Sequence, residues 1–286
     1  MKTLRCLAAV MICASAPSGI GSQELDEKTT IRETWTFPAG SRSVEIRVDN
    51  IEGSIAVSGY GGDTVEMTAE KLIHARSAEA LQRARDEVTL DIVRRSDLFD
   101  AYVNTPWRRE EGRRRKGRPA DPGYRVRFDF VLQVPAGAKI FLRTINDGDI
   151  RVQNISGDYD IKNINGGIEM LEVSGSGDAY ALNGKLRGLF RGNPVRASYF
   201  GTLNGDIDLF FQPGLSADLR LKTFNGEVYT DFEITGLPPE PMQKTEHEGR
   251  SVYKAPEYFG VRVAAGGPEM RLETFNGDIR VHCREP

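Results

Sequence analysis

Seven basic side chains in one short segment are the residues with the clearest capacity for chemistry. The segment between Pro106 and Pro119 contains these seven basic residues but only two acidic ones, and Trp107 precedes them. The basic residues are Arg108, Arg109, Arg113, Arg114, Arg115, Lys116 and Arg118. Guanidinium groups make two-pronged contacts with phosphates, and an indole beside them suits a lipid interface. The loop at residues 106–122 is therefore the sharpest candidate for contact with lipid A, teichoic acid or another anionic polymer. A charge run of this kind is more often a solvated loop without a ligand.

Carboxylates near several glycines form the second group of residues that could take part in catalysis or metal binding. Paired acids could line a calcium site or a glycan-cleaving groove; the candidates are Asp149, Asp158, Asp160, Asp206, Asp208 and Asp278. In the calcium-binding nonapeptide repeat an Asp belongs at the sixth place, where this chain has Gln153, Lys162, Leu171 and Tyr180. Acids that follow glycine are more often solvated turn residues. We therefore predict no catalytic residue and no metal site, with a glycan-active β-helix enzyme kept as the alternative.

The histidines and cysteines give no further site. His74, His247 and His282 are far apart in the sequence, and no Cys/His group has metal-ligand spacing. His282 and Cys283 are adjacent, so on a strand their side chains would point to opposite faces. We predict no cofactor.

Asn-Gly pairs recur ahead of strand-like segments and predict the architecture that positions these groups. The pairs are Asn165-Gly166, Asn183-Gly184, Asn204-Gly205, Asn225-Gly226 and Asn276-Gly277, with a split version at Asn146-Asp147-Gly148. From Gly148 onward these glycines lie 18, 18, 21, 21 and 51 residues apart. A period near twenty is typical of stacked coils. We interpret the pairs as structural turns, because Gly and Asn adopt positive φ cheaply and the Asn side chain can bond to the neighbouring turn.

A nine-residue spacing divides each coil into two halves. Glycines stand at 148, 157, 166, 175 and 184, and apolar residues alternate after them, as at Ile150 and Val152. Such alternation predicts short strands with one buried face. Because the halves repeat with equal spacing and polarity, we predict an all-β β-solenoid of stacked coils; an antiparallel sandwich is the alternative.

The remaining chain predicts two further parts and one helix. Residues 23–134 are predicted as an N-terminal β region that contains a helix at about 78–88, with Ser77 as its N-cap. Residues 135–286 form the regular solenoid, interrupted by an insertion at about 235–268. The insertion carries Tyr253, Tyr258 and Phe259, which could stack on sugar rings or close the end of a solenoid.

Residues 1–22 have the layout of a secretory signal peptide, with Lys2 and Arg5 ahead of an apolar stretch. Removing them changes the formal charge from −3 to −5, which gives no overall attraction to nucleic acid. No later apolar run reaches the roughly 20 residues of a membrane helix. We expect a protein of the periplasm, cell surface or extracellular space. A lipid anchor at Cys13 is disfavoured by the bulky Ile12 before it.

Repeated Thr-x-Asn-Gly-Asp-Ile units carry a family likeness. They stand at residues 144–150, 202–207, 223–228 and 274–279, after a segment that ends in Val134-Pro135-Ala136-Gly137. In this order of features, from Val44 to Val281, the chain resembles the putative-adhesin family of bacterial envelope proteins, domain of unknown function 4097. The resemblance implies an exported all-β repeat protein that is linked with the cell surface or with the response to envelope stress and has no catalytic residues.

The sequence thus predicts a non-enzymatic envelope protein, an adhesin or scaffold that binds a surface polymer or a protein partner. A stack of short coils offers the extended face that such binding needs. An accessory protein in envelope-stress sensing remains open beside the enzyme alternative.

Overall fold

A computed structural model describes residues 11–13, 24–38, 44–106, 108, 121–239, 243–247, 250–254 and 257–285. The chain forms two compact units, residues 1–150 and 151–286. The sequence-based division places its boundary after residue 134 instead. Each unit is described by itself below. In the described part, no helix has the length and apolar character needed to cross a membrane.

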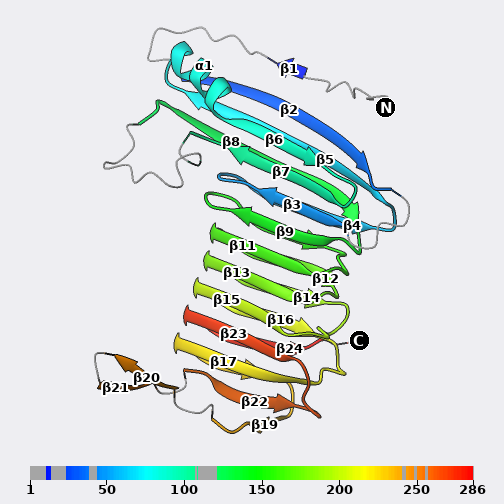
Figure 1. Cartoon of the computed structure of the whole chain (residues 1–286), viewed down its shortest axis with the longest axis vertical. Helices are drawn as coiled ribbons and strands as arrows, with labels where there is room; N and C mark the ends of the chain where they lie inside the picture. Colours follow the sequence, from blue (N-terminus) through cyan, green and yellow to red (C-terminus); the bar gives the residue numbers. More distant parts are fainter. Residues whose placement is uncertain are drawn as a thin grey trace. The chain divides into compact units, whose positions relative to one another are not determined.

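Unit 1 consists of one helix and strands that form two sheets (Figure 1). The hydrogen-bonded orders are β1-β2-β5-β8-β4 and β9-β3-β7-β6. The elements are β1 (Met11–Cys13), β2 (Leu25–Thr36), β3 (Glu45–Asp49), β4 (Ile55–Tyr60), β5 (Thr64–Ala75), α1 (Ala78–Glu87), β6 (Thr89–Arg94), β7 (Leu98–Asn104), β8 (Tyr124–Pro135) and β9 (Lys139–Thr144).

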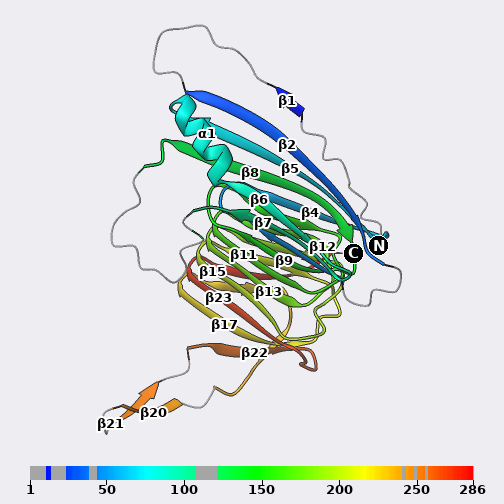
Figure 2. The same ribbon diagram turned by 45° about the horizontal axis from the view of Figure 1, so that its top comes forward.

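The predicted helix is confirmed. It starts where Ser77 Oγ accepts a hydrogen bond from the Ala80 amide at 3.1 Å, which satisfies one of the free donors of the first turn. Ala80 and Ala84 are buried on its inner side. The helix contacts β5 and β8, and Figure 2 shows it lying over these strands. Alternation along β5 and β8 buries Met67 against its partner Leu132, which gives unit 1 its core.

Unit 2 contains two further sheet orders, β10-β12-β14-β16-β24-β18 and β11-β13-β15-β23-β17-β22-β19, and the hairpin β20-β21. Its strands are β10 (Ile150–Gln153), β11 (Tyr159–Asn165), β12 (Ile168–Val173), β13 (Gly177–Asn183), β14 (Leu186–Phe190), β15 (Ser198–Asn204), β16 (Ile207–Phe211), β17 (Ala217–Asn225), β18 (Val228–Thr230), β19 (Ile234–Gly236), β20 (Gln243–His247), β21 (Arg250–Lys254), β22 (Phe259–Val263), β23 (Glu269–Asn276) and β24 (Ile279–Cys283).

Successive strands from β11 to β18 alternate between the two sheets, and equivalent strands pair in parallel. Tyr159 pairs with Gly177 of the next coil, and Asp178 pairs with Tyr199 of the coil after that. The predictions of an all-β fold and of parallel stacking are confirmed. The β-solenoid itself is not shown, because the strands form two open sheets rather than a closed coil.

The side chains between the two sheets of unit 2 form its core. Alternation places Phe190, Phe200 and Phe211 there, all fully buried. The ring of Phe190 stacks on that of Phe211 with centroids 4.7 Å apart and meets that of Phe200 edge-on at 5.8 Å. The nine-residue apolar pattern therefore corresponds to one strand for each sheet.

The Asn-Gly corners need glycine for a reason beyond the predicted positive φ, which Gly166 and Gly277 do adopt. Among the described residues other than glycine, positive φ occurs at Asp147, Asn154, Glu172 and Ala264, so the prediction of left-handed corner asparagines is wrong. A Cβ on Gly205 would lie 2.2 Å from the carbonyl oxygen of Gly184 one coil away. Gly184, Gly226 and Gly277 meet the same obstacle at 1.9–2.3 Å. Glycine is required because successive corners touch backbone to backbone.

The corner asparagines form a ladder of amide hydrogen bonds. Each Nδ2 donates to the Oδ1 of the next corner, from Asn183 to Asn165 at 2.9 Å and then at 2.7 Å along Asn204, Asn276 and Asn225. The threonine of each unit supports the same contact from inside. Thr274 Oγ1, for example, donates to the Gly205 carbonyl at 3.0 Å. The repeated Thr-x-Asn-Gly pattern is thus a set of bonds between coils.

The last coil does not lie at the end of the stack. β23 pairs with β15 on one side and with β17 on the other, so the C-terminal coil is inserted between two coils that precede it in the chain. β24 is likewise placed between β16 and β18. β22 then covers the other edge of β17 in antiparallel pairing. Chain order alone would have placed residues 269–283 beyond β17.

Replacement of Gly205 by alanine should lower the free energy of unfolding by about 3 kcal/mol, because the new methyl group cannot fit against Gly184 without moving the backbone. Denaturant unfolding of residues 23–286 measures the change. Gly214→Ala is the matched control, since a Cβ there meets nothing within 4 Å. Equal stability of the two variants would contradict the close corner contact.

Candidate functional site

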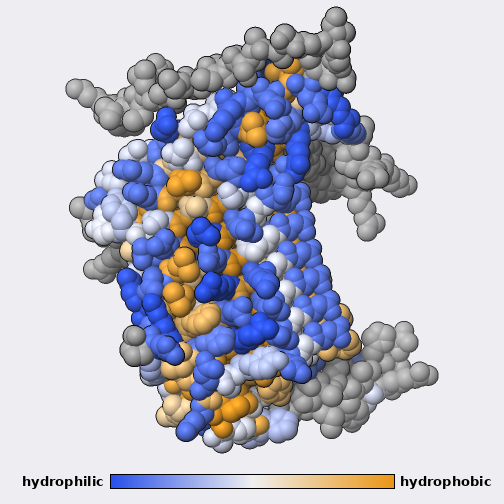
Figure 3. Space-filling model, turned by 180° about the vertical axis from the view of Figure 1, so that it is seen from behind, coloured by the Kyte–Doolittle hydropathy of each residue, from blue (hydrophilic) through white to orange (hydrophobic). Residues whose placement is uncertain are grey.

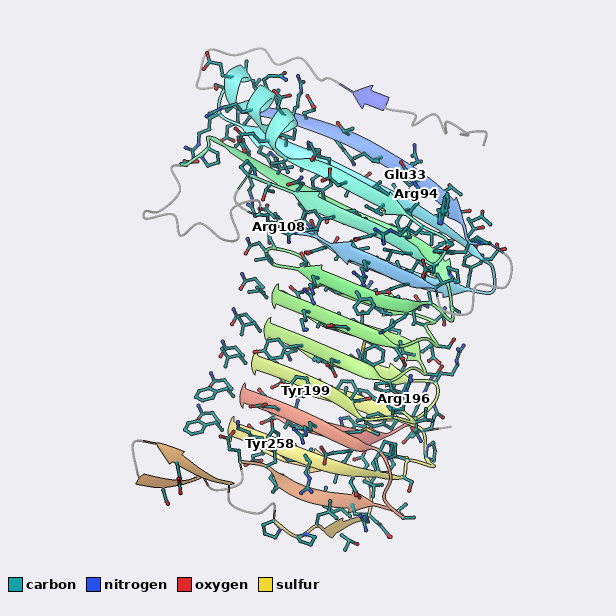
Figure 4. The ribbon with its side chains drawn as sticks, in the orientation of Figure 1. Glu33, Arg94, Arg108, Arg196, Tyr199 and Tyr258 are labelled. Atoms are coloured by element: carbon teal, nitrogen blue, oxygen red, sulfur yellow. The ribbon has the colours of Figure 1, made fainter. Side chains whose placement is uncertain are left out.

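A hollow of about 600 Å³ lies on the outer face of the sheet β13-β15-β23-β17. Tyr199 and Tyr258, labelled in Figure 4, belong to the group of side chains around it. Its lining combines aromatic, apolar and charged groups and consists of Tyr180, Tyr199, Thr202, Leu203, Lys222, Phe224, Glu257, Glu273, Thr274 and Phe275.

Two tyrosines form one wall of the hollow because of the strand register. Asp178 pairs with Tyr199 and Tyr180 pairs with Gly201, so the two tyrosines are diagonal neighbours. Their rings stack with centroids 6.4 Å apart and an interplanar angle of 18°. A Cβ on Gly201 would lie 2.5 Å from Tyr199 Oη and 2.8 Å from the Tyr180 ring. Gly201 therefore leaves the room that these rings occupy.

A hydrogen-bonded group of charged residues forms the opposite side. Glu273 accepts hydrogen bonds from Lys222 Nζ at 2.8 Å and from Tyr258 Oη at 2.5 Å. Lys222 Nζ also donates to Glu257 at 2.7 Å and lies 5.5 Å from the centre of the Tyr258 ring. Tyr199 Oη approaches Glu273 at 3.5 Å. One ammonium group thus holds two carboxylates beside the tyrosines.

The electrostatics keep this group charged. Burial alone would raise the pKa of Glu273, but hydrogen bonds from Lys222 and Tyr258 outweigh it and hold that pKa below its usual value. The hydrogen bonds to Glu257 and Glu273 raise the pKa of Lys222. Burial, followed by the hydrogen bond to Glu273, raises the pKa of Tyr258 to about 12. At neutral pH the hollow therefore has fixed charges and hydroxyl groups that keep their protons.

Exposed apolar side chains continue from the hollow along the corners. Each occupies the position just before a corner asparagine. Phe224 and Phe275 stack with centroids 4.7 Å apart and are 71% and 45% exposed. Leu203 and Ile164 at equivalent places are 38% and 39% exposed. Stacked apolar groups in water at regular intervals suit contact with an extended ligand.

The opposite sheet carries an apolar column. Figure 3 shows apolar side chains gathered among hydrophilic ones on that face. The strand register aligns Leu171, Leu189, Phe210 and His282. The ring of Phe210 stacks on that of His282 with centroids 4.6 Å apart. These groups pack on one another along the sheet.

Of the basic residues in the predicted loop, the structure describes Arg108, whose side chain is tied to unit 1. Its guanidinium donates to Asp49 Oδ1 at 2.7 Å and to the Asn50 carbonyl at 3.1 Å, and it lies 4.8 Å from the centre of the Tyr102 ring. The structure therefore gives Arg108 a local anchoring role. Outside the described residues lie Trp107, Arg109, Arg113, Arg114, Arg115, Lys116 and Arg118.

Five of the six predicted corner acids are held by basic side chains, and the sixth, Asp149, is exposed. Arg280 reaches Asp206, Asp208 and Asp278, and Arg196 pairs with Asp158. Lys162 pairs with Asp160 at 3.2 Å. In the described part of the chain, no group of three or more His, Cys, Asp or Glu residues could hold a metal ion. The five held acids are thus arranged as surface ion pairs.

Of the aromatic residues predicted as a possible sugar site, Tyr258 and Phe259 do not line the hollow, although Tyr258 bonds to a lining residue. Of the aromatic group in the insertion, Tyr258 reaches Glu273, Phe259 lies on β22 and is 49% exposed, and Tyr253 belongs to β21. The sequence analysis did not single out Tyr199, Lys222, Glu257 or Glu273. Alternation marks Tyr199 and Lys222 as outward-facing, but only the inserted position of β23 brings Glu273 between them.

Comparison with known proteins leaves the family open. No family model matches the chain, and no curated protein matches it. Among solved structures, it is similar to a putative cell adhesion protein from Clostridium sporogenes ATCC 15579, with 10% identity over 88% of this chain and 99% of that chain and a TM-score of 0.41. It is also similar to a putative adhesin from Bacteroides fragilis NCTC 9343, with 8% identity over 89% of this chain and 97% of that chain and a TM-score of 0.33.

A putative lipid binding protein from Parabacteroides distasonis ATCC 8503 has 9% identity over 90% of this chain and 97% of that chain, with a TM-score of 0.23. Scores this low carry no weight in assigning a fold family or a function.

The Glu273→Gln variant should be destabilised by about 1.5 kcal/mol at neutral pH, because it loses charged hydrogen bonds from Lys222 and Tyr258. The folded pKa of Glu273 lies below the ordinary 4.5, so its contribution is present above pH 4.5 and is lost as pH falls through the folded pKa. The difference from the parent protein should therefore disappear in acid.

Denaturant unfolding at neutral pH and at about pH 3 measures this effect. Glu233→Gln, at an exposed position, is the control and should change stability little at either pH. A Glu273→Gln difference that is unchanged in acid would contradict the charged state of Glu273.

Proposed function

We propose that this protein is an exported, non-enzymatic binding protein of the bacterial envelope, an adhesin or scaffold, and that it holds a surface glycan in the hollow on unit 2. The observation that carries the proposal is the pair of stacked tyrosines, Tyr180 and Tyr199, beside the ion pair of Lys222 and Glu273. The resemblance of the Thr-x-Asn-Gly units to envelope adhesins agrees with this reading.

A glycan fits both sides of the hollow. The C–H faces of sugar rings pack on aromatic rings, and their hydroxyl groups donate to carboxylates and accept from ammonium groups. A volume of about 600 Å³ falls in the range of small-ligand sites and would admit a short stretch of sugar units. The exposed column that continues to Phe275 and Phe224 offers further stacking positions for a longer polymer.

Binding is favoured over glycan cleavage by the state of the two acids. A glycosidase needs one carboxylic acid that is protonated at working pH, usually through a raised pKa. Here Lys222 bonds to both Glu257 and Glu273, and the pKa of Glu273 is lowered. Neither acid is in the environment that a proton donor requires.

The architecture and the location belong to the same proposal. We regard the stacked coils of unit 2 as a short β-solenoid, whose long face suits an extended polymer. Export rests on the signal-like residues 1–22. The envelope polymer, or an envelope protein that carries the glycan, is the proposed partner.

Tyr199→Ala in residues 23–286 should weaken binding to a bacterial-glycan array at least tenfold, about 1.4 kcal/mol, because it removes a stacking wall and a hydroxyl beside Glu273. Tyr229→Ala is the matched control, since Tyr229 is 47% exposed and pairs with Glu227 and Arg280 on the other sheet. Equal loss in both variants would contradict the assignment of the hollow.

The basic loop is tested in the same assay. The variant changes Arg109, Arg113, Arg114, Arg115, Lys116 and Arg118 to Ser and leaves Arg108, because Arg108 anchors unit 1 through Asp49. Unchanged glycan binding in this variant supports the hollow as the binding site. Binding that is lost in this variant and fades with salt would move the site to the loop.

A further inference from the structure

The C-terminal coil occupies a place in unit 2 that any coil with the same motif could fill. Met270 of β23 pairs with Ser198 on one side and with Leu219 on the other. The bonds that hold it there are those of the repeat. Asn276 donates to Asn204 and accepts from Asn225, each at 2.7 Å. No contact among these depends on a residue type peculiar to this coil.

The two coils that flank it could also pair directly with each other. Gly205 and Gly226 have the same separation in the sequence as Gly184 and Gly205, which already belong to adjacent coils. Thr223 Oγ1 now donates to the Gly277 carbonyl at 3.0 Å, and Thr274 Oγ1 donates to the Gly205 carbonyl at 3.0 Å. Without the C-terminal coil, the Gly205 carbonyl would be available to Thr223. If the C-terminal coil left, β17 could close on β15 in an unchanged register.

The inserted coil is joined to β22, and the two strands enclose β17. We call residues 259–283 the C-terminal clasp. Its connection crosses the start of β17, where Ser216 Oγ donates to the Gly266 carbonyl at 2.6 Å. Arg262 holds Asp218 through two hydrogen bonds of 2.7 and 2.8 Å. A tether of residues 231–258 connects the clasp to β18 and includes β19, which pairs with β22. The part of the tether after β19 is long enough for the clasp to reach another molecule.

We propose that the C-terminal clasp exchanges between two copies of this chain, each clasp inserting between β15 and β17 of the partner molecule. The exchanged dimer contains the same corner and core contacts as the closed monomer and differs only in the path of the tether. Exchange of an identical element costs little for this reason, and concentration decides the balance between the forms. The proposal is independent of the glycan ligand.

Cross-linking between two single-cysteine variants tests the exchange. Both are made in residues 23–286 with Cys283→Ser, one with Asn204→Cys and the other with Asn276→Cys. These side chains are hydrogen-bonded neighbours on paired strands, a distance that a disulfide spans. The mixture is unfolded and refolded together at low and high protein concentration, oxidised and run on a non-reducing gel. The control mixture pairs Asn165→Cys with Asn276→Cys, because β11 is not adjacent to β23.

A 204–276 heterodimer that increases with concentration and exceeds the 165–276 control by at least fivefold is expected. A double variant that carries both Asn204→Cys and Asn276→Cys keeps the proposal falsifiable. If its two cysteines form a disulfide within one chain while the mixture gives no heterodimer above the control, clasp exchange is overturned. If the double variant forms no disulfide at all, the inserted position of the clasp is wrong, and the proposal falls with it.

Discussion

Close backbone contact between successive Asn-Gly corners is the constraint on which the rest of unit 2 depends. The corner glycines approach the carbonyl oxygens of neighbouring coils so closely that no side chain fits. This contact fixes the register, and the amide ladder through Asn204 and Asn276 maintains it in water. Because register in a sheet decides which side chains become neighbours, the corners determine that Tyr180 faces Gly201 and that Lys222 faces Glu273. The binding hollow is a consequence of corner geometry several residues away.

The local architecture could be predicted from the sequence because it repeats. Nine-residue glycine spacing and alternating apolar residues were enough to predict strands and parallel stacking, and Ser77 as an N-cap helped to predict the helix. Bonding of the Asn side chains to neighbouring turns was expected from residue preferences, but the backbone contact that requires glycine was not. Asparagine and glycine both favour positive φ in turns, yet here the asparagines serve as hydrogen-bonding rungs and the glycines permit contact. Composition alone does not separate these two uses of the same pair.

The hollow was beyond sequence reasoning for a topological reason. Lys222 and Glu273 are far apart in the sequence and become partners only because β23 is inserted between β15 and β17. The distance in sequence from Tyr180 to Tyr199 matches neither of the two coil spacings, 18 and 21 residues. The two tyrosines are therefore not at equivalent positions of their coils, and the strand register makes them diagonal neighbours. The aromatic residues of the insertion drew attention because they were clustered, and of these Tyr258 bonds to Glu273, which lines the hollow. Clustering in sequence was a partial guide to clustering in space.

The proposed glycan site and the proposed clasp exchange depend on one strand. Glu273 and Phe275 belong to β23, whereas Tyr199 and Lys222 belong to the strands that β23 separates. In a chain whose clasp has left, the regular coil spacing would bring Lys222 beside Gly201, and the hollow would lose its central carboxylate. A ligand that bonds to Glu273 therefore binds only forms in which a clasp is inserted, whether its own or that of a second copy. By mass action such a ligand stabilises the inserted state over the released one. The closed monomer and the exchanged dimer both place Glu273 beside Lys222, so a ligand held by these two groups alone does not shift the balance between them.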